Sequence, residues 1–414
     1  MTHLLYRLLM WLLVPFAIVR LALRARRQPG YLANVKERFG FYTQRPAHPV
    51  IWVHAVSVGE TRAAEPLVRA LMSRHPHKQI LLTNMTPTGR ETAETLFGDE
   101  VLHCYLPYDL VPAVDRFLHH FRPQAAIVME TELWPTLVAR CSHHGIPAHL
   151  VNARLSGRSA KRYARFPKMT RALLGRLNIV CAQTDRDAQR FSELGAPNVE
   201  VTGNLKFDRS APEQQIELGA TLRTLFGSQR HVFLAASTRE GEEALLLEAI
   251  ASINVPAMLT VIVPRHPQRF DAVAAMLEQQ GLTYQRRSEN QPIDAGTQVV
   301  LGDSMGEMFA YYAACDIAFI GGSLLPLGGQ NLLEACAVGK PVVIGPHTFN
   351  FEEATEHAIE AGAAIRVADT DALAKTVASL LSDRERAARI GEAGRRFMTQ
   401  HRGATARTVA AIGL

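Results

Sequence analysis

Short apolar segments alternate with longer segments of helical periodicity along most of the chain, and this alternation limits the possible folds more than any other feature. Continuous apolar runs of this kind are typical of strands buried on both faces. Their alternation with helices predicts parallel sheets covered by helices. The expected strands are Val50–Val53, Ile80–Thr83, Val101–Leu106, Ala125–Met129, Ala148–Val151, Ile179–Ala182, Val232–Ala236, Leu259–Val263, Val299–Leu301, Ile317–Ile320, Val342–Ile344 and Ala364–Val367.

The alternation is interrupted around residues 207–217, where polar side chains and Pro212 occur. A chain of 414 residues is also longer than one ordinary domain. We therefore predict an α/β fold of two doubly wound, Rossmann-like domains facing a cleft, at residues 28–206 and 218–414, with a linker at 207–217. Whether the last helices cross back to the first domain stays open. Ligands are expected at the carboxyl ends of the strands.

Residues 1–27 differ from the rest of the chain, because Leu4–Leu23 is almost entirely apolar. The uninterrupted run Leu8–Val19 is shorter than the ~20 residues that a spanning helix needs. No small-residue cleavage site follows, which argues against a removed signal peptide. We interpret this segment as an uncleaved membrane anchor, either tilted across the bilayer or lying in its plane; the alternative is a buried first helix. Four arginines at its end favour a cytoplasmic position for the following domain: Arg20, Arg24, Arg26 and Arg27.

Charge and cysteine usage exclude several classes of function. The net charge of +6 is modest, and the second basic cluster, at residues 154–171, lacks interleaved aromatics that would stack on bases. An anionic membrane or substrate is therefore favoured over nucleic acid. The five cysteines are far apart, which predicts neither a disulfide framework nor a metal site. Asp185 and Asp187 resemble a metal-binding pair, but a helix cap is the better interpretation, so no metal site is expected.

The segment Gly321–Glu334 has the order strand end, glycine loop, helix start. Glycines allow a close approach of the backbone to a phosphate, and the N–H groups of a first helical turn attract anions. We expect the helix to begin at Gln330 and Asn331, with Glu334 placed to accept a hydrogen bond from a ribose hydroxyl. The alternative is an ordinary strand-to-helix turn with a cap, since neither G-x-G-x-x-G nor a Walker lysine is present.

Ionisable residues follow several strands of the first half. Glu60 opens a helix after Gly59, where the helix dipole favours the anion and the carboxylate could accept a proton from an alcohol. A simple capping role for Glu60 is equally compatible with the local sequence. Glu130 and Glu132 follow a buried strand, where two carboxylates are expensive without a role or a partner. Lys206 precedes the expected linker.

In the second half of the chain, a positively charged residue follows one of the expected strands. Pro264 and Arg265 follow an expected strand, and a rigid turn that presents an arginine suits a phosphate. The small residues around Met305 and Gly306 allow backbone contact with a base or a ribose, and Glu307 follows them.

Several of these segments together resemble the Kdo transferases of lipopolysaccharide synthesis (3-deoxy-D-manno-octulosonic acid transferases). The resemblance extends over nearly the whole chain, and Asn331-Leu-Leu-Glu334 departs from it slightly, since proline often follows the asparagine in the family. Its motifs occur in order: His54-Ala-Val-Ser-Val-Gly-Glu60, Met129-Glu-Thr-Glu-Leu-Trp-Pro135, Asn152-Ala-Arg-Leu-Ser156, Gly203-Asn-Leu-Lys-Phe-Asp208, Val263-Pro-Arg-His-Pro267 and Gly345-Pro-His-Thr-Phe-Asn-Phe351.

The resemblance implies a two-domain GT-B glycosyltransferase that transfers Kdo from CMP-Kdo to a lipid A precursor, with inversion and without a metal or cofactor. It implies a position on the cytoplasmic side of the inner membrane, anchored by the N-terminal segment, with contacts to anionic lipid. The acceptor would bind the first domain and the donor the second. Glu60 would be the proton acceptor, and Glu130 and Lys206 would stabilise the transition state. The implied CMP-binding residues are Pro264, Arg265, Met305, Gly306, Glu307, Asn331, Leu332, Leu333 and Glu334.

Two alternatives remain at this point. A nucleotide-sugar 2-epimerase shares the fold, but such enzymes are soluble, so the apolar N-terminal segment argues against it. An inactive sugar-nucleotide-binding scaffold is disfavoured by the joint presence of Glu60, Glu130, Lys206 and Arg265. Glu132 could exchange roles with Glu130, and the motifs fix neither the number of Kdo residues transferred nor the acylation of the acceptor.

Overall fold

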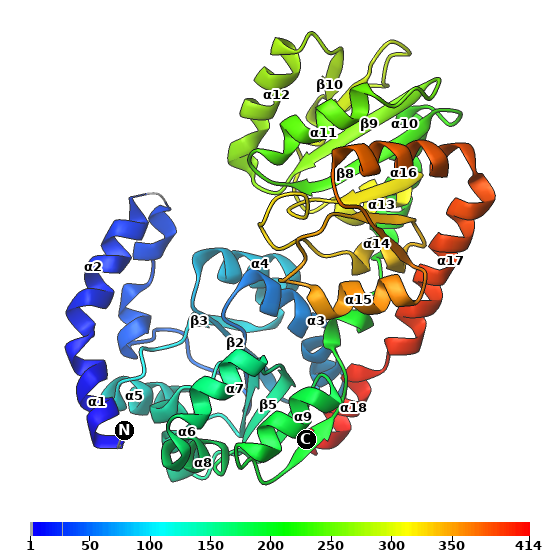
Figure 1. Ribbon diagram of the computed structural model, residues 1–414. Coiled ribbons are helices and arrows are strands. Elements are labelled where there is room, and N and C mark those ends of the chain that lie inside the picture. Colours follow the sequence, from blue (N-terminus) through cyan, green and yellow to red (C-terminus); the bar gives the residue numbers. More distant parts are fainter. Residues whose placement is uncertain (1–2, 27) are drawn as a thin grey trace. The chain divides into compact units, whose positions relative to one another are not determined.

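The computed structural model describes residues 3–26 and 28–414; Met1, Thr2 and Arg27, the last arginine of the N-terminal basic cluster, lie outside the described residues. The chain divides into two compact units. Unit 1 comprises Met1–Arg209 and His401–Leu414, and unit 2 comprises Ser210–Gln400 (Figure 1).

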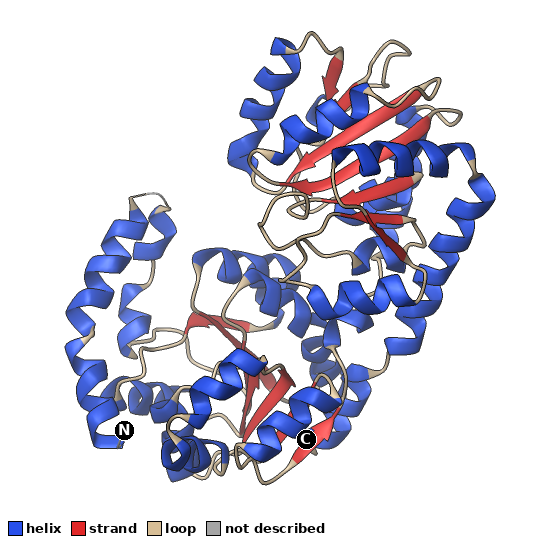
Figure 2. Ribbon diagram, viewed as in Figure 1, coloured by secondary structure: helices blue, strands red, loops and turns tan. Residues whose placement is uncertain are grey.

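Unit 1 is built on a seven-stranded parallel sheet of order β3-β2-β1-β4-β5-β6-β7 with helices on its faces (Figure 2). Its strands are β1 (Val50–His54), β2 (Gln79–Asn84), β3 (Leu102–Tyr105), β4 (Ala125–Met129), β5 (Ala148–Ala153), β6 (Ile179–Ala182) and β7 (Val199–Val201). Its α-helices are α1 (His3–Leu12), α2 (Val14–Ala25), α3 (Val58–Arg74), α4 (Pro87–Phe97), α5 (Val111–Phe121), α6 (Pro135–His143), α7 (Gly157–Ala164), α8 (Pro167–Leu174), α9 (Asp185–Glu193) and α18 (Ala404–Ile412). Short 3-10 helices are η1 (Pro29–Leu32), η2 (Val35–Phe39), η3 (Gly98–Glu100) and η4 (Leu205–Asp208).

Unit 2 contains a second seven-stranded parallel sheet, of order β10-β11-β9-β8-β12-β13-β14. Its strands are β8 (His231–Thr238), β9 (Met258–Pro264), β10 (Tyr284–Arg286), β11 (Val299–Leu301), β12 (Ile317–Ile320), β13 (Val342–Ile344) and β14 (Ala364–Arg366). Its helices are α10 (Glu213–Phe226), α11 (Glu242–Ala251), α12 (Phe270–Gln279), α13 (Met308–Ala314), α14 (Leu333–Ala337), α15 (Glu352–Glu360), α16 (Thr370–Ser382) and α17 (Arg384–His401), with η5 (Pro267–Arg269) and η6 (Arg287–Glu289) as 3-10 turns.

Each central strand packs against a core on both faces, as its continuous apolar sequence requires. Side chains alternate across a strand with a period of two. On β1, Trp52 faces one cluster and packs edge-on against Phe117 at 4.8 Å between ring centroids. Ile51 and Val53 belong to the other cluster, which includes Leu67 of α3. The prediction of two doubly wound parallel sheets is therefore confirmed.

The twelve predicted strands are all present, but the sequence interpretation missed β7 and β10. Each has three residues and lies at an edge of its sheet. Their residues are only partly buried or exposed, so neither forms the apolar run by which the other strands were found.

The strand orders place a topological switch point in each unit. In unit 1 the chain runs from β1 outward through β2 to β3 and then returns to β4, on the other side of β1. In unit 2 the strands β9, β10 and β11 lie on one side of β8, and the chain then returns to place β12 on the other side of β8. Loops that leave adjacent strands in opposite directions open a crevice at the carboxyl edge, where doubly wound folds bind ligands. The two crevices lie after β1 and β4 and after β8 and β12.

Helices α1 and α2 carry most of their large apolar side chains on the outside. Leu8, Leu12 and Phe16 are 59%, 70% and 63% exposed. By length and hydropathy no single helix of the described residues qualifies as a membrane span, whereas α1 and α2 qualify together as one pair bent by 40°. Tyr6 of α1 donates a hydrogen bond to the buried Asp109 of unit 1, with 2.8 Å between the oxygens. The alternative of a buried first helix does not fit this exposure.

The last helix, α18, belongs to unit 1. The carboxylate of Asp208 accepts hydrogen bonds from the N–H groups of Gly403 and Thr405 at the start of α18. Val409 and Ile412 of α18 join the same apolar cluster as Leu67 of α3.

Candidate active site

Glu60 lies in the first turn of α3, directly after β1, and its carboxylate is held by two donors. Its Oε2 accepts the N–H of Val56 at 2.9 Å, and its Oε1 accepts the hydroxyl of Ser57 at 3.0 Å. The side chain is only 9% exposed. The capping role considered from the sequence is therefore partly realised, because Glu60 satisfies a backbone donor at the helix start.

Burial, together with the negative charges of Glu130 and Glu132, raises the pKa of Glu60 to about 7, although the hydrogen bonds from the Val56 N–H and the Ser57 hydroxyl oppose the shift. The sequence had suggested that the helix start would favour the anion. Instead, loss of hydration and two like charges outweigh the dipole. A carboxyl group with a pKa near 7 is suited to accept a proton at neutral pH.

Glu130 follows β4 across the switch point from Glu60 and is held in a left-handed conformation, with φ of 54°. This conformation is uncommon for a residue with a side chain and is often found at functional sites. The Glu130 N–H donates to the carbonyl of Val151 on the neighbouring strand. Lys206 approaches the carboxylate, with 3.5 Å between Nζ and Oε1.

Asn152, at the end of β5, positions the lysine. It too is left-handed, with φ of 51°, and it is fully buried. Its Oδ1 accepts the N–H of Leu205 at 3.0 Å, which fixes the start of η4 immediately before Lys206. The motifs around Glu130, Asn152 and Lys206, which are far apart in the sequence, thus meet at one edge of the sheet.

Glu132 remains the second carboxylate of this edge. Burial raises its pKa, and the charge of Glu130 raises it further. Glu130 forms an ion pair with Lys206. This geometry favours Glu130 as the partner of the lysine and leaves Glu132 as a carboxyl group with a raised proton affinity.

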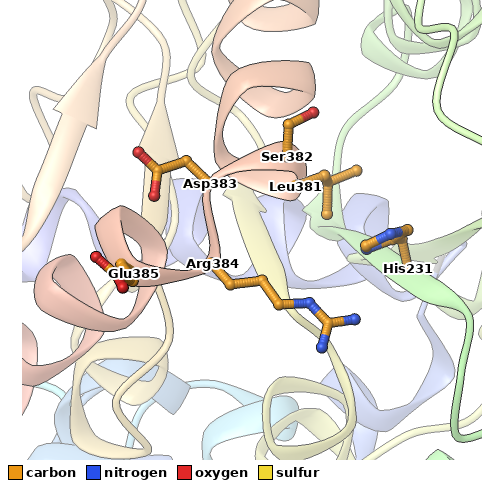
Figure 3. Close-up of a pocket in the computed structure, with 6 residues that line it drawn as sticks. All are labelled: His231, Leu381, Ser382, Asp383, Arg384 and Glu385. Atoms are coloured by element: carbon orange, nitrogen blue, oxygen red, sulfur yellow. The ribbon is translucent and has the colours of Figure 1, made fainter.

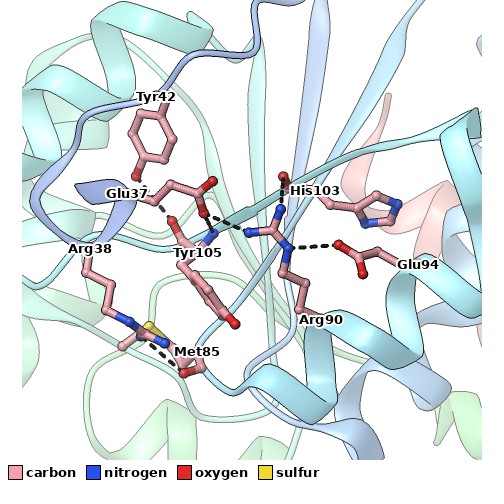
Figure 4. Close-up of polar contacts among 8 residues, drawn as sticks. All are labelled: Glu37, Arg38, Tyr42, Met85, Arg90, Glu94, His103 and Tyr105. Atoms are coloured by element: carbon pink, nitrogen blue, oxygen red, sulfur yellow. Dashed lines mark hydrogen bonds and ion pairs between the residues drawn. The ribbon is translucent and has the colours of Figure 1, made fainter. Parts of the chain in front are cut away.

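A polar cluster that the sequence interpretation did not single out lies beside this edge (Figure 4). Glu37 accepts hydrogen bonds from the Tyr105 N–H at 2.7 Å and from Arg90 at 2.9 Å. Arg38 is 2% exposed, lies 4.1 Å over the Tyr105 ring and donates to the carbonyl of Met85. The N–H of Met85 in turn donates to the carbonyl of Val56, so the cluster supports the loop that holds Glu60.

In unit 2, Pro264 ends β9 and is buried, and Arg265 follows it at the carboxyl edge, half-buried. The N–H of Arg265 donates to the carbonyl of Thr238 at the end of β8, at 2.9 Å. This hydrogen bond ties the arginine's backbone to the strand beside the switch point.

The segment Met305–Glu307 forms a loop before α13. Gly306 has φ of 81°, a conformation that glycine adopts without strain, and Met305 is 54% exposed. Glu307 is held by Arg287 at 3.2 Å and by the hydroxyl of Ser304 at 2.6 Å. The loop therefore presents an apolar side chain and backbone groups from a fixed position.

The glycine loop after β12 already binds an anion, and that anion is a side chain of the protein. The fully buried Glu242 accepts the N–H groups of Gly322, Ser323 and Leu324 at 2.6, 3.0 and 3.0 Å. It also accepts the N–H of Arg239 at 3.2 Å. The N–H groups of Gly322, Ser323 and Leu324 are therefore occupied by Glu242 and are not available to a phosphate.

The helix after the glycine loop begins later than expected, at Leu333 and not at Gln330, and it spans only Leu333–Ala337. Asn331 Oδ1 accepts the N–H of Leu333 at 3.1 Å, as a cap does. Leu332 and Leu333 are buried core residues, and Glu334 is 8% exposed. Of these four candidate donor residues, the two leucines can offer a ligand only their backbone.

Asp187 is occupied by structural contacts. It accepts the N–H of Leu155 at 2.8 Å and the hydroxyl of Thr184, whose Oγ1 caps α9. The cap of α9 is thus Thr184 and not Asp185 or Asp187. In the described ranges 3–26 and 28–414, no cluster of three or more His, Cys, Asp or Glu side chains could hold a metal ion.

One open pocket lies away from all these residues. It is lined by His231, Leu381 and Ser382 and by the turn Asp383–Glu385 between α16 and α17 (Figure 3). His231 is the first residue of β8, so this pocket lies at the amino edge of the unit 2 sheet, whereas the candidate donor residues follow the carboxyl ends.

Comparison with known proteins connects this geometry to a family. Residues 33–209 match the family model described as 3-Deoxy-D-manno-octulosonic-acid transferase (kdotransferase), and residues 229–397 match the model of Glycosyl transferases group 1. The chain is 44% identical over 405 residues to the 3-deoxy-D-manno-octulosonic acid transferase of Bordetella pertussis, covering 94% of each chain. It is 39% identical to the enzyme of that name from Haemophilus influenzae, covering 97% of this chain and 96% of the relative.

Solved structures share the two-unit architecture at much lower identity. A UDP-GlcNAc 2-epimerase from Neisseria meningitidis is 16% identical with a TM-score of 0.61, covering 88% of this chain and 99% of its own. A glycosyltransferase from Rickettsia africae is 14% identical with a TM-score of 0.59, covering 89% and 98%. At such identity the likeness shows the GT-B type fold alone, and the epimerase is a neighbour in fold only. The full-length matches at 39% and 44% identity decide the family: the chain belongs to the 3-deoxy-D-manno-octulosonic acid transferases, which are glycosyltransferases.

Proposed function

We propose that this enzyme transfers Kdo from CMP-Kdo to a sugar hydroxyl of a lipid A precursor in lipopolysaccharide synthesis. The observation that carries the proposal is Glu60, a nearly buried carboxyl group at the unit 1 switch point whose pKa is raised to about 7. Transfer to an alcohol needs a group that takes the hydroxyl proton at neutral pH, and Glu60 has the burial and proton affinity for it.

The reaction is a direct displacement with inversion. Glu60 accepts the proton of the acceptor hydroxyl, whose oxygen forms a bond to the anomeric carbon of Kdo. The bond from that carbon to the phosphate oxygen breaks, and CMP leaves with the electron pair. Glu130 faces the positive character that develops at the anomeric carbon, and Lys206 balances the neighbouring negative charge. Arg265 stabilises the leaving phosphate with charge-assisted hydrogen bonds.

The other donor-binding residues contribute shape and polarity in unit 2. The exposed Met305 and the backbone around Gly306 offer a surface for the base, while Glu307, Asn331 and Glu334 offer oxygen acceptors to the base and the ribose. We propose that no metal ion or cofactor takes part, because arginine and lysine side chains supply the positive charge that magnesium supplies in other transferases.

We propose further that α1 and α2 hold the enzyme on the cytoplasmic face of the inner membrane. Their exposed side chains include Leu8, Leu12 and Phe16, and the second half of α2 carries Arg20 and Arg24. An amphipathic pair with arginines at its end suits an interface of anionic lipid. The basic and exposed helix α7 in the same unit adds attraction to an anionic lipid head group.

The test is mass spectrometry of the lipid after incubation of the full-length enzyme with CMP-Kdo and a lipid A precursor. The expected result is a lipid whose mass has grown by one or more Kdo residues, with release of CMP. A parallel reaction with UDP-GlcNAc and no acceptor tests epimerisation, for which we expect no product. Unmodified lipid, or an epimerised sugar nucleotide, would contradict the proposal.

A further inference from the structure

The loop after β8 occupies the switch point of unit 2 and contains an arginine that the sequence interpretation did not single out. Arg239 follows the last residue of β8, next to the glycine loop that follows β12. Ligands of doubly wound sheets bind in the crevice between two such loops. Arg265 follows β9, the strand on the other side of β8.

Several backbone N–H groups around this crevice already donate hydrogen bonds to a buried carboxylate, so they are not available to an anionic ligand. Glu242 accepts the N–H groups of Gly322, Ser323 and Leu324 from the β12 loop and of Arg239 from the β8 loop. A buried carboxylate with four donors neutralises the positive potential that these amides would otherwise present. Recognition of an anionic ligand here therefore depends on side chains.

The side chain of Arg239 is in position for that task. It is half-buried, and within the described parts of the chain its guanidinium makes no ion pair and no hydrogen bond. The side chain of Arg239 passes close to Gly322. A Cβ added to Gly322 would lie 3.4 Å from Cγ of Arg239 and 3.2 Å from the amide nitrogen of Gln330. Burial lowers the pKa of the His266 imidazole, and the positive charges of Arg265 and Arg239 lower it further. The two arginines therefore share one neighbourhood.

The backbone before Arg239 is strained. Ser237 has φ of 57°, and the pairing of β8 with β9 shifts register between Ala236 and Thr238. This backbone conformation requires a glycine at position 321, because a Cβ there would lie 2.5 Å from the carbonyl oxygen of Ser237. Left-handed residues with side chains cost free energy and cluster where the chain must present a group to a ligand. Here the distortion redirects the chain into the turn that carries Arg239.

We propose that Arg239 binds the carboxylate of the donor's sugar acid, while Arg265 binds the phosphate. The inference rests on the proposed function, because only then does the donor carry both anions. In an activated ulosonic acid the carboxylate and the phosphate are attached to the same anomeric carbon. The two arginines follow the adjacent strands β8 and β9, and the spacing of neighbouring strands, about 4.8 Å, is compatible with two anions attached to one carbon. A half-buried arginine that finds its carboxylate only in the correct donor also disfavours sugar nucleotides with neutral sugars.

The test separates the two anions by comparing CMP, which has only the phosphate, with CMP-Kdo, which has both. For Arg239→Gln we expect a ten- to hundredfold higher KM for CMP-Kdo and a Kd for CMP within twofold of wild type. Arg239→Lys keeps the charge and should recover part of the loss. Arg265→Ala is the matched comparison and should weaken CMP and CMP-Kdo together. Thermal unfolding of Arg239→Gln should be unchanged, because the guanidinium has no protein partner in the described residues.

Each other outcome counts against the inference. An equal loss of CMP and CMP-Kdo binding in Arg239→Gln would assign this arginine to the phosphate. Wild-type values for both ligands would remove it from the donor site. Wild-type enzyme that binds CMP but transfers no Kdo would instead contradict the proposed function, and this inference with it.

Discussion

The two units use the same position in similar sheets for opposite charges. In unit 1 the switch point between β1 and β4 carries the carboxyl groups of Glu60 and Glu130. In unit 2 the corresponding position between β8 and β12 carries Arg239, with Arg265 on the next strand. The fold thus determines where a ligand binds, and the side chains at that place determine which chemistry is possible.

The difference follows from what each unit is proposed to bind. An acceptor hydroxyl must lose a proton, which calls for a carboxyl group of raised pKa. A donor with two anionic groups calls for guanidinium groups, which stay charged at any physiological pH. In unit 1 the like charges of Glu60, Glu130 and Glu132 raise proton affinity, so crowding them is useful. In unit 2 the buried carboxylate of Glu242, beside the site, is committed to backbone donors.

The largest effect is expected from removing the unit 1 base. Glu60→Gln should reduce kcat by about 10²–10⁴-fold, because an amide cannot accept the proton. CMP affinity, measured by calorimetry, should stay within twofold, since the donor residues belong to unit 2. Glu91→Gln removes an exposed carboxylate from α4 of the same unit and should retain wild-type activity. Turnover of Glu60→Gln within a few-fold of wild type would leave Glu60 as a helix cap only.

The next largest effect is expected from a substitution in unit 2, and it concerns the affinity for CMP. Arg265→Ala should raise the Kd for CMP by about ten- to a hundredfold, the range for a lost charge-assisted hydrogen bond. Its thermal midpoint should stay close to that of wild type. Arg389→Ala changes an arginine on α17 whose side chain is 69% exposed, and it serves as the control. An unchanged CMP affinity in Arg265→Ala would remove Arg265 from the phosphate site.

A smaller effect, greatest with membrane-bound acceptor, is expected from changes in the N-terminal helix pair. Removal of residues 1–27 should shift part of the enzyme to the soluble fraction and slow transfer in vesicles more than in detergent. Exchange of the exposed Leu8, Leu12 and Phe16 for glutamine should do the same while keeping the Tyr6–Asp109 hydrogen bond. Vesicle flotation and parallel assays measure both. Loss of CMP binding in the substituted protein would mean that these side chains support the fold.

No effect is expected from chelation. Transfer should continue at an unchanged rate in excess EDTA, because the proposed mechanism neutralises the leaving phosphate with Arg265 and Lys206. Activity that is lost on chelation and restored by magnesium would show that Arg265 and Lys206 are insufficient and would contradict the proposed metal-independent mechanism.

Much of this arrangement could be predicted from the sequence, and the failures have physical reasons. Buried strands form apolar runs, so the sheets and the strand-end positions of Glu60 and Arg265 followed from local patterns. The edge strands β7 and β10 lack such runs. Glu242 was missed because its role depends on backbone amides 80 residues away along the chain, which no local pattern reveals. The pKa of Glu60 likewise depends on Glu130 and Glu132, which only the fold brings close.

The most direct test of the account is the acid limb of the pH profile of kcat/KM. Glu60 accepts a proton only when ionised, so the rate should fall tenfold per unit below a pKa of about 7. Because the charge of Glu130 raises that pKa, Glu130→Gln should move the limb to lower pH, whatever its effect on the maximal rate. The same acceptor in every assay keeps the ionisation of its own groups constant. A limb that stays in place in Glu130→Gln, or that persists in Glu60→Gln, would contradict the assignment of Glu60 as the base.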